Sequence, residues 1–354
     1  MNRLLLFCRP GFEPEAGREV TDAAAAQGAW GYFEPGAGGG WLVFTLAGGL
    51  DAPELLARLP LETLVFVRDW LLLVTGVTLP VSDRVGAVTE ALRESPVHPC
   101  SRVEVRIPEN CTDADLGRFA RKWVAPLSRS LREAGLLGAD DERQDRLELL
   151  LPDFSHALVG ISPANNRARW PMGIPRLRLP ADAPSRSALK LEEAWKVLLP
   201  ADRSLDYLGG GRSAVDLGAA PGGWTWQLVR QGMQVTAVDN GPMDEALMAT
   251  GMVTHVRADG YQWRPKRAAD WMVCDIVDKP RRTASMVGDW FTDQLCRFSV
   301  FNLKLPMKRR YDEWLLCRSL LETRLADAPF GFRLRARQLY HDREEITCFL
   351  ERTD

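Results

Sequence analysis

In the first half of the chain, short apolar runs alternate with amphipathic stretches. Apolar or alternating runs predict strands at 4–8, 41–46, 64–67, 71–77, 102–107, 146–151 and 156–161. Helical spacing predicts helices at 13–27, 53–59, 82–93 and 113–134. This mixture of short strands and helices indicates small α+β layers.

The second half shows a more regular alternation of strands and helices. Strands are predicted at 213–217, 234–239, 269–275, 299–303, 333–339 and 344–350, with a further strand-like stretch at 255–258. Helices are predicted at 187–198, 224–231, 290–297 and 311–326. Strands that alternate with helices favour a doubly wound α/β sheet. The last two strands follow one another without a helix, which departs from an all-parallel fold.

A segment rich in proline and arginine separates the two halves. Prolines recur between Pro163 and Pro184, and a proline neither continues a helix nor donates an amide hydrogen. The arginines among them either belong to a solvated linker or form a strip that contacts phosphates. The predicted domains are 1–60, 61–165 and 186–354, with a basic linker at 166–185.

Composition narrows the classes of protein that remain. The chain has 354 residues, 46% of them hydrophobic and 26% charged, and a net charge of −2, which excludes a strongly basic nucleic-acid coat. Residues 1–170 carry 18 Lys and Arg against 23 Asp and Glu, so positive charge is concentrated in the second half. The seven cysteines and four histidines are scattered, which supports neither disulfides nor a metal site. We expect a cytoplasmic monomer that does not associate with membranes.

The clearest chemical signal is a glycine-rich turn within 214–224. An apolar strand ends, the chain turns through glycines and a helix begins, so that the backbone can approach a ligand closely. The pattern is not GxGxxG, and Pro221 removes an amide donor, which weakens the case for a pyrophosphate site. The candidate cofactor-binding residues here are Asp216, Gly218, Ala220, Pro221, Gly222 and Gly223.

Two acidic residues extend this candidate site. Asp239 ends the next strand, at the position of a carboxylate that binds ribose hydroxyls, and Asp259 follows a third strand-like stretch, where it is expected to meet an adenine amino group. Together they indicate a cofactor that contains a nucleoside. A nicotinamide nucleotide or a purely structural turn stays open on spacing alone.

Further charged residues lie where a ligand would bind. Asp275 and Lys304 end two predicted strands, and ligands of open α/β sheets lie beyond the carboxyl ends of the strands. Lys190 lies on the helix that enters the domain, and Glu345 starts the last strand. Each alone is most simply a surface charge. Glu344 and Glu345 face opposite sides of a strand, and we favour Glu345.

Together with the glycine-rich turn, Lys190, Asp275, Lys304 and Glu345 resemble the Lys-Asp-Lys-Glu tetrad of 2′-O-methyltransferases. More closely, the chain resembles the family of bacterial 23S rRNA 2′-O-ribose methyltransferases of type M. The resemblance is strongest over 185–354 and implies a Rossmann-like methyltransferase domain, preceded by a ferredoxin-like unit and a THUMP RNA-binding domain.

The resemblance also implies the chemistry. The cofactor would be S-adenosylmethionine, bound over the glycine-rich turn with Ser187 nearby, and the substrate a cytidine of 23S rRNA. Lys304 would be the base that removes the proton of the ribose 2′-hydroxyl, with Lys190, Asp275 and Glu345 as the other catalytic residues. Asp275 would also bind the cofactor. A lysine has a pKa of about 10.4, so the site must favour its neutral form. Lys190 favours that form, and the two acids oppose it.

Other functions predict different residues. Transfer to an exocyclic amine usually needs an Asn/Asp-Pro-Pro-aromatic loop, whereas 275–280 lacks a proline pair. Transfer to pyrimidine C5 needs a nucleophilic cysteine, but Cys274 precedes Asp275 and is expected in the core. The alternative is an RNA-binding protein with a Rossmann-like domain that acts on a different RNA or has no catalytic activity. A protein without catalysis is expected to have lost a tetrad residue.

Overall fold

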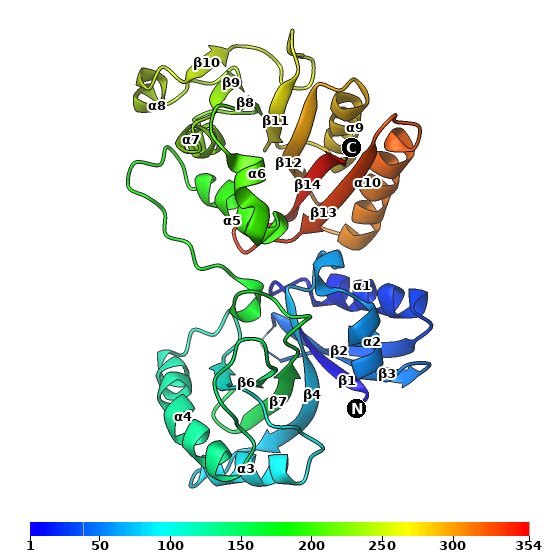
Figure 1. Cartoon of the computed structure of the whole chain (residues 1–354), viewed down its shortest axis with the longest axis vertical. Coiled ribbons are helices and arrows are strands. Elements are labelled where there is room, and N and C mark those ends of the chain that lie inside the picture. The colour runs from blue at the N-terminus through cyan, green and yellow to red at the C-terminus, as the bar shows by residue number, and fades with distance from the viewer. Residues whose placement is uncertain (38, 354) are drawn as a thin grey trace. The chain divides into compact units, whose positions relative to one another are not determined.

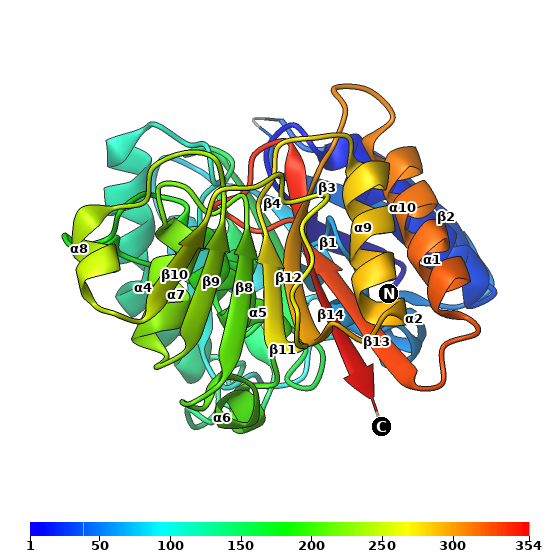
Figure 2. The ribbon, with the colours of Figure 1, turned by 90° about the horizontal axis from the view of Figure 1, so that it is seen from above.

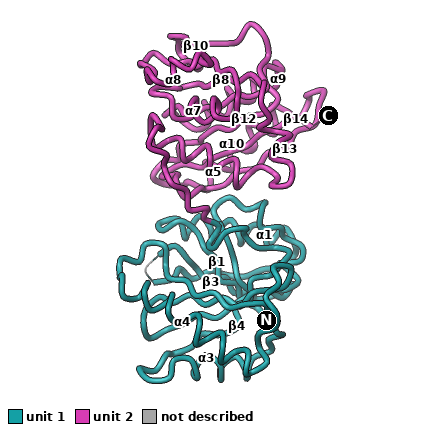
Figure 3. Tube along the Cα trace, turned by 60° about the vertical axis from the view of Figure 1, so that its left-hand side comes forward, with its two compact units in different colours: residues 1–173 teal, residues 174–354 magenta. Residues whose placement is uncertain are grey.

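Two seven-stranded sheets organise the chain, one in each of its two units. The computed structural model describes residues 1–37 and 39–353. The units comprise residues 1–173 and 174–354, and their border falls inside the segment 166–185 that the sequence predicts as a linker (Figure 3). No helix among the described residues is long and apolar enough to cross a bilayer.

The first unit is built on a mixed sheet with the strand order β2-β3-β1-β4-β7-β6-β5 (Figure 1). Its strands are β1 (Arg3–Phe7), β2 (Trp30–Pro35), β3 (Trp41–Gly48), β4 (Asp69–Thr78), β5 (Val103–Arg106), β6 (Arg146–Leu150) and β7 (His156–Ser162). Its helices are α1 (Glu13–Ala26), α2 (Ala52–Arg58), α3 (Arg84–Arg93) and α4 (Ala114–Glu133). Strands from both predicted N-terminal domains, 1–60 and 61–165, share this one sheet.

The second unit has the order β10-β9-β8-β11-β12-β14-β13. Its strands are β8 (Ser213–Leu217), β9 (Gln234–Val238), β10 (Val253–Val256), β11 (Ala269–Cys274), β12 (Cys296–Lys304), β13 (Gly331–Arg337) and β14 (Glu345–Thr353). Its helices are α5 (Ala188–Leu198), α6 (Ser204–Leu208), α7 (Gly223–Arg230), α8 (Glu245–Ala249), α9 (Pro280–Thr292) and α10 (Arg310–Leu325).

In the second sheet, the segments that follow the parallel strands lie together at one edge. The five strands from β10 to β12 are parallel, and β14 and β13 continue the sheet antiparallel, so the predicted α/β sheet with a closing antiparallel pair is confirmed. Helices α5 and α7 cover one face and α9 and α10 the other (Figure 2). The carboxyl ends of the parallel strands therefore meet at one edge, beside the start of β14.

Two predicted elements are wrong. Residues 64–67 form no strand, because the backbone amides of Val65 and Phe66 donate to the buried carboxylate of Glu19, at 2.6 and 2.8 Å. The buried glutamate replaces the partner strand that those amides would otherwise need.

The predicted helix 290–297 is also displaced. Helix α9 begins earlier, at Pro280, a residue favoured in the first turn of a helix, and it ends at Thr292. Gln294 has a φ of 55°, which ends the helical path, and Cys296 already pairs with β11. Of residues 290–297, 290–292 end helix α9, 293–295 form a turn, and 296–297 begin β12. The sequence prediction also omits β2.

Candidate active site

Four charged side chains meet at the edge where the parallel strands end. Lys190 comes from the first turn of α5, Asp275 directly follows β11, Lys304 is the last residue of β12, and Glu345 is the first of β14. Lys304 and Glu345 are paired directly across the two antiparallel strands, which brings their side chains together. The structure therefore gathers all four residues that the sequence singles out.

Positive and negative groups alternate within this cluster. Lys304 Nζ donates to Asp275 Oδ1 at 2.5 Å and also to Glu345 Oε2. Lys190 Nζ donates to Glu345 Oε1 and lies 3.6 Å from Asp275 Oδ2. Each carboxylate thus contacts both ammonium groups. The side chain of Glu345 is only 5% exposed, so these contacts are poorly screened by water.

The sequence leaves the charge of Lys304 open, and the structure gives a direction. Burial by itself lowers the pKa of Lys304, but the carboxylates of Asp275 and Glu345 outweigh that effect and raise the pKa above its ordinary value. The protein without ligands therefore holds Lys304 as an ammonium group. A role as a base requires that this proton leaves first.

Glu344 lies outside the cluster. Its Oε2 accepts a hydrogen bond from Arg310 Nε at 2.7 Å, and its side chain is 43% exposed. Successive residues of a strand point to opposite faces, so only one of the two adjacent glutamates can meet the lysines. The structure places Glu345 there.

The glycine-rich turn joins β8 to α7 at the same edge. Gly218 and Gly222 have φ values of 78° and 119°, which side chains rarely tolerate. A Cβ atom at Gly218 would lie 2.6 Å from Ile276 Cγ1, and one at Gly222 would lie 2.5 Å from Leu247 Cδ2. The turn therefore has its shape only with glycine at these positions.

The other expected cofactor-binding residues lie around this turn, some of them exposed and some buried. Asp239 ties the turn to the end of β9, because its carboxylate accepts from Ala220 N at 3.0 Å and from Gly241 N at 2.7 Å. Asp259 is exposed beyond β10, where its carboxylate accepts from Tyr261 N at 2.9 Å.

Ser187 lies beside Gly223, and Asp216 lies in β8 just before the turn. The hydroxyl of Ser187 is 2.6 Å from that of Ser185. The carboxyl of Asp216 is fully buried and accepts a hydrogen bond from Thr225 Oγ1 at 2.6 Å. Burial raises the pKa of Asp216 to about 7. The hydrogen bond between Thr225 and Asp216 therefore links α7 to β8, the two elements that the turn joins.

Three buried polar residues beside the tetrad escape the sequence prediction. Asn302 and Thr347 are paired across β12 and β14, and Asp342 lies in the loop before β14. Asn302 precedes Lys304 by two residues and Thr347 follows Glu345 by two, so both lie on the face of the sheet that carries the tetrad. A polar residue two positions from a tetrad residue, within an otherwise apolar strand, is the sequence signal that could have identified Asn302 and Thr347.

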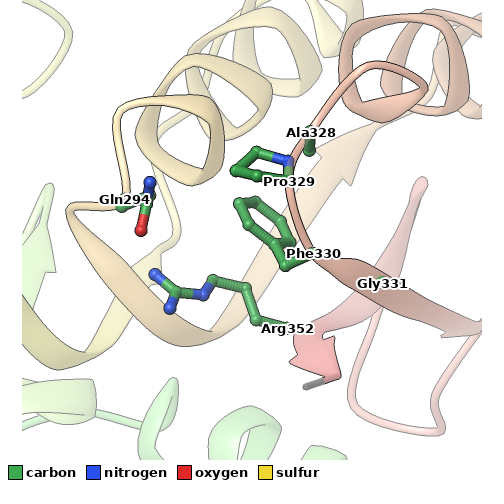
Figure 4. Close-up of a pocket in the computed structure, with 6 residues that line it drawn as sticks. All are labelled: Gln294, Ala328, Pro329, Phe330, Gly331 and Arg352. Carbon is green, nitrogen blue, oxygen red and sulfur yellow. The ribbon is translucent and has the colours of Figure 1, made fainter.

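A separate hollow in this unit lies away from the tetrad. It is lined by residues near the start of β12, the start of β13 and the end of β14: Gln294, Ala328, Pro329, Phe330, Gly331 and Arg352 (Figure 4). Because Gln294 precedes β12 and Lys304 ends it, the hollow belongs to the opposite edge of the sheet.

Comparisons with known proteins match three regions of the chain to described families. Residues 1–71 match the RlmM ferredoxin-like domain, residues 83–163 the N-terminal region of ribosomal RNA large subunit methyltransferase M, and residues 183–321 the FtsJ-like methyltransferase family. The ribosomal RNA large subunit methyltransferase M of Marinobacter nauticus is 65% identical over 100% of both chains. This chain belongs to the ribosomal RNA large subunit methyltransferase M family. Proteins of the same name from Ectopseudomonas mendocina and Cellvibrio japonicus are each 46% identical over 99% of both chains.

Membership of the methyltransferase M family confirms the resemblance stated from the sequence. The chain is an rRNA methyltransferase with a Rossmann-like α/β domain and an N-terminal ferredoxin-like domain. The FtsJ-like match also confirms, at the level of the family, the expectation that S-adenosylmethionine is the methyl donor. The alternative of an RNA-binding module without catalysis is not supported.

Proposed function

We propose that this methyltransferase modifies the ribose 2′-hydroxyl of a cytidine in 23S rRNA, with Lys304 as the base. The observation that carries the proposal is the tetrad, in which two lysines and two carboxylates converge at the carboxyl edge of the sheet. A ribose hydroxyl is a weak nucleophile and needs a base within hydrogen-bond reach. Lys304 Nζ is the nitrogen suited to that task, since it stands at the end of β12.

The residues around the glycine-rich turn fit S-adenosylmethionine, which supplies the methyl group. The turn has positive φ at Gly218 and Gly222, which lets backbone rather than side chains face a ligand. Asp239, tied to the same turn, offers carboxylate oxygens to ribose hydroxyls, and the exposed Asp259 is suited to an adenine amino group. Ser187 and the buried Asp216 support the turn.

The tetrad then has two tasks, to hold a hydroxyl and to accept its proton. Lys304 must first release its own proton, because its pKa is raised in the protein without ligands. Its side chain is 19% exposed, so the proton has a path to solvent. The neutral amine then accepts the 2′-hydroxyl proton at Nζ. Lys190 Nζ donates to Glu345 and holds that carboxylate beside Lys304. Catalysis relies largely on positioning the reactants.

The loops beside the tetrad favour an RNA substrate at this edge. Val277 is 84% exposed and Met307 is 75% exposed, and these two residues lie just beyond Asp275 and Lys304 in the chain. The same loops carry exposed cations, Lys279, Lys308 and Arg309. Exposed apolar side chains next to cations suit unstacked bases and their phosphates.

The N-terminal unit is proposed to bind and present the RNA, in line with the THUMP domain expected over 61–165. Helix α4 buries Trp123 and Leu127 and exposes a row of cations on its other side. These exposed residues are Arg118, Arg121, Lys122, Arg129 and Arg132. The protein is proposed to act as a monomer on rRNA that is free or partly assembled.

The experiment that tests the function is transfer of a tritiated methyl group to rRNA that lacks the modification. Digestion of the product to nucleosides should give labelled 2′-O-methylcytidine. Label on another nucleoside, or on a base, would contradict the proposal. Lys304→Ala should abolish transfer while S-adenosylmethionine still binds. Retained transfer in that variant would refute the assignment of the base.

A further inference from the structure

A continuous chain of buried hydrogen bonds runs from the tetrad into the protein interior. Asn302 Nδ2 donates to Asp275 Oδ1 at 2.9 Å, and Thr347 Oγ1 lies 2.7 Å from Asn302 Oδ1. Thr347 Oγ1 also lies 3.0 Å from both carboxyl oxygens of Asp342. Asn302, Thr347 and Asp342 are each no more than 1% exposed. Their protons are therefore shared among these groups rather than with water.

Counting the protons fixes the direction of this chain. Asp275 contacts both ammonium groups and is an ionised acceptor, so the amide of Asn302 must turn its NH2 group toward it. The carbonyl oxygen of Asn302 then faces Thr347 and can only accept. A threonine hydroxyl has one proton, and it is used in this bond. The contact between Thr347 and Asp342 therefore needs a proton that belongs to Asp342.

The surroundings of Asp342 favour the neutral acid. The charged and titratable groups facing it are Glu345 on β14 and Lys190 and Glu193 on α5, and Glu193 contacts the neighbouring His341, with 2.6 Å between Oε2 and Nδ1. Among the described residues, no lysine or arginine forms an ion pair with Asp342. Burial, reinforced by Glu345, raises the pKa of Asp342 to about 8, although Leu339 N donates to it at 2.9 Å.

We propose that Asp342 is a protonated carboxylic acid that donates to Thr347 and, through Thr347 and Asn302, orients Asp275 of the tetrad. Asp342, Thr347 and Asn302 are thus positioning residues, because none of them contacts Lys304 directly. Their hydrogen bonds hold the carboxylate of Asp275 so that Oδ1 accepts from Lys304 and Oδ2 faces Lys190. The part of this inference that concerns methyl transfer rests on the proposed function, whereas the protonation of Asp342 does not.

The protonation state is tested by infrared difference spectroscopy of the full-length protein. The wild-type protein at neutral pH should show a carbonyl band of a protonated carboxylic acid that is absent from Asp342→Asn and retained in Asp216→Asn, which removes another buried acid with a raised pKa. The band should also disappear as the pH rises above 8. If Asp342→Asn keeps every carbonyl band of the wild type, the proposal is overturned, whichever nucleoside the enzyme methylates.

The positioning role is tested by kinetics with a matched pair of variants. Thr347→Val keeps the shape of the side chain and removes the hydroxyl, and we expect kcat to fall by about 10- to 100-fold with KM for rRNA and binding of S-adenosylmethionine unchanged. Thr347→Ser restores the hydroxyl and should recover most of kcat. Asp342→Asn still offers a donor and should stay within a few-fold of wild type at neutral pH, whereas Asp342→Ala should resemble Thr347→Val.

The results separate this inference from the proposed function. Equal kcat in Thr347→Val and Thr347→Ser, both folded by circular dichroism, would refute the positioning role. Label found on a base rather than on ribose would refute the proposed function and leave the infrared result intact. A fall in kcat together with weaker S-adenosylmethionine binding would show a general structural effect and would also overturn the positioning role.

Discussion

Replacing Glu345 with Gln should move the pH dependence of methyl transfer toward lower pH. The carboxylate of Glu345 contacts both lysines and is one cause of the raised pKa of Lys304. Two unit charges 4 Å apart interact by about 4 kcal/mol at an effective dielectric constant of 20. Since 1.36 kcal/mol corresponds to one pKa unit, removing the charge lowers the pKa of Lys304 by up to about 3 units.

The assay is single-turnover transfer of a tritiated methyl group at saturating S-adenosylmethionine, measured between about pH 6.5 and 9.5. The wild-type rate should rise about tenfold per pH unit across this range, because Lys304 is mostly protonated throughout. The rate of Glu345→Gln should level off toward the upper end of this range, after a shift of about 2 to 3 pH units. Its plateau should lie below the wild-type rate at high pH, because the amide NH2 group of glutamine opposes one of the two lysines.

Glu344→Gln is the matched control. It removes a charge from the neighbouring residue, whose carboxylate pairs with Arg310 outside the tetrad. Its pH profile should coincide with that of the wild type. If Glu345→Gln keeps the wild-type slope over the whole range, Glu345 does not set the pKa of Lys304 and the electrostatic reasoning fails. A shift of equal size in both variants would show that only net charge matters.

Three further predictions concern the cofactor turn and stability. Gly222→Ala should weaken binding of S-adenosylmethionine by roughly 5- to 150-fold in calorimetry, since φ is 119° and the new Cβ would lie 2.5 Å from Leu247 Cδ2; Gly210→Ala, with 3.7 Å to its closest neighbour, should not. Thr225→Val should lower the free energy of unfolding by about 1–3 kcal/mol in urea, because Asp216 loses a buried hydrogen bond, and Thr225→Ser should lower it less. Asp216 and Asp342 have pKa values raised in the folded protein to about 7 and about 8. Their contribution to the free energy of unfolding is therefore complete below about pH 4 and is lost as the pH rises to 8. Asp216→Asn should therefore flatten the fall of unfolding free energy with pH.

The tetrad could be anticipated from the sequence because strand ends of a parallel sheet converge. Asp275 and Lys304 close two apolar strands, and no tertiary information is needed to place both at one edge. The choice between Glu344 and Glu345 was harder, since it depends on which face of β14 meets β12. Pairing of Glu345 with Lys304 decides it, and that register is set by contacts along both strands.

Other features depend on tertiary contacts that local patterns do not contain. Residues 64–67 have the composition of a strand, yet their amides bind Glu19, which lies more than forty residues earlier in the chain. The helix predicted at 290–297 is wrong because this segment spans the end of α9, a turn and the start of β12. In both cases the type of backbone pairing depends on residues elsewhere in the fold, which the local pattern does not contain.

The charge balance at the tetrad explains why a neutral acid is useful beside it. With both lysines and both carboxylates charged, the cluster is neutral, and it becomes negative when Lys304 releases its proton. Any additional carboxylate nearby would resist that release by raising the pKa of Lys304 further. As a protonated acid, Asp342 supplies a hydrogen-bond donor to Thr347 without adding negative charge. An ionised group in the same place would keep Lys304 protonated and so unable to accept a proton. The buried, protonated Asp342 therefore serves both the geometry of Asp275 and the release of the proton from Lys304.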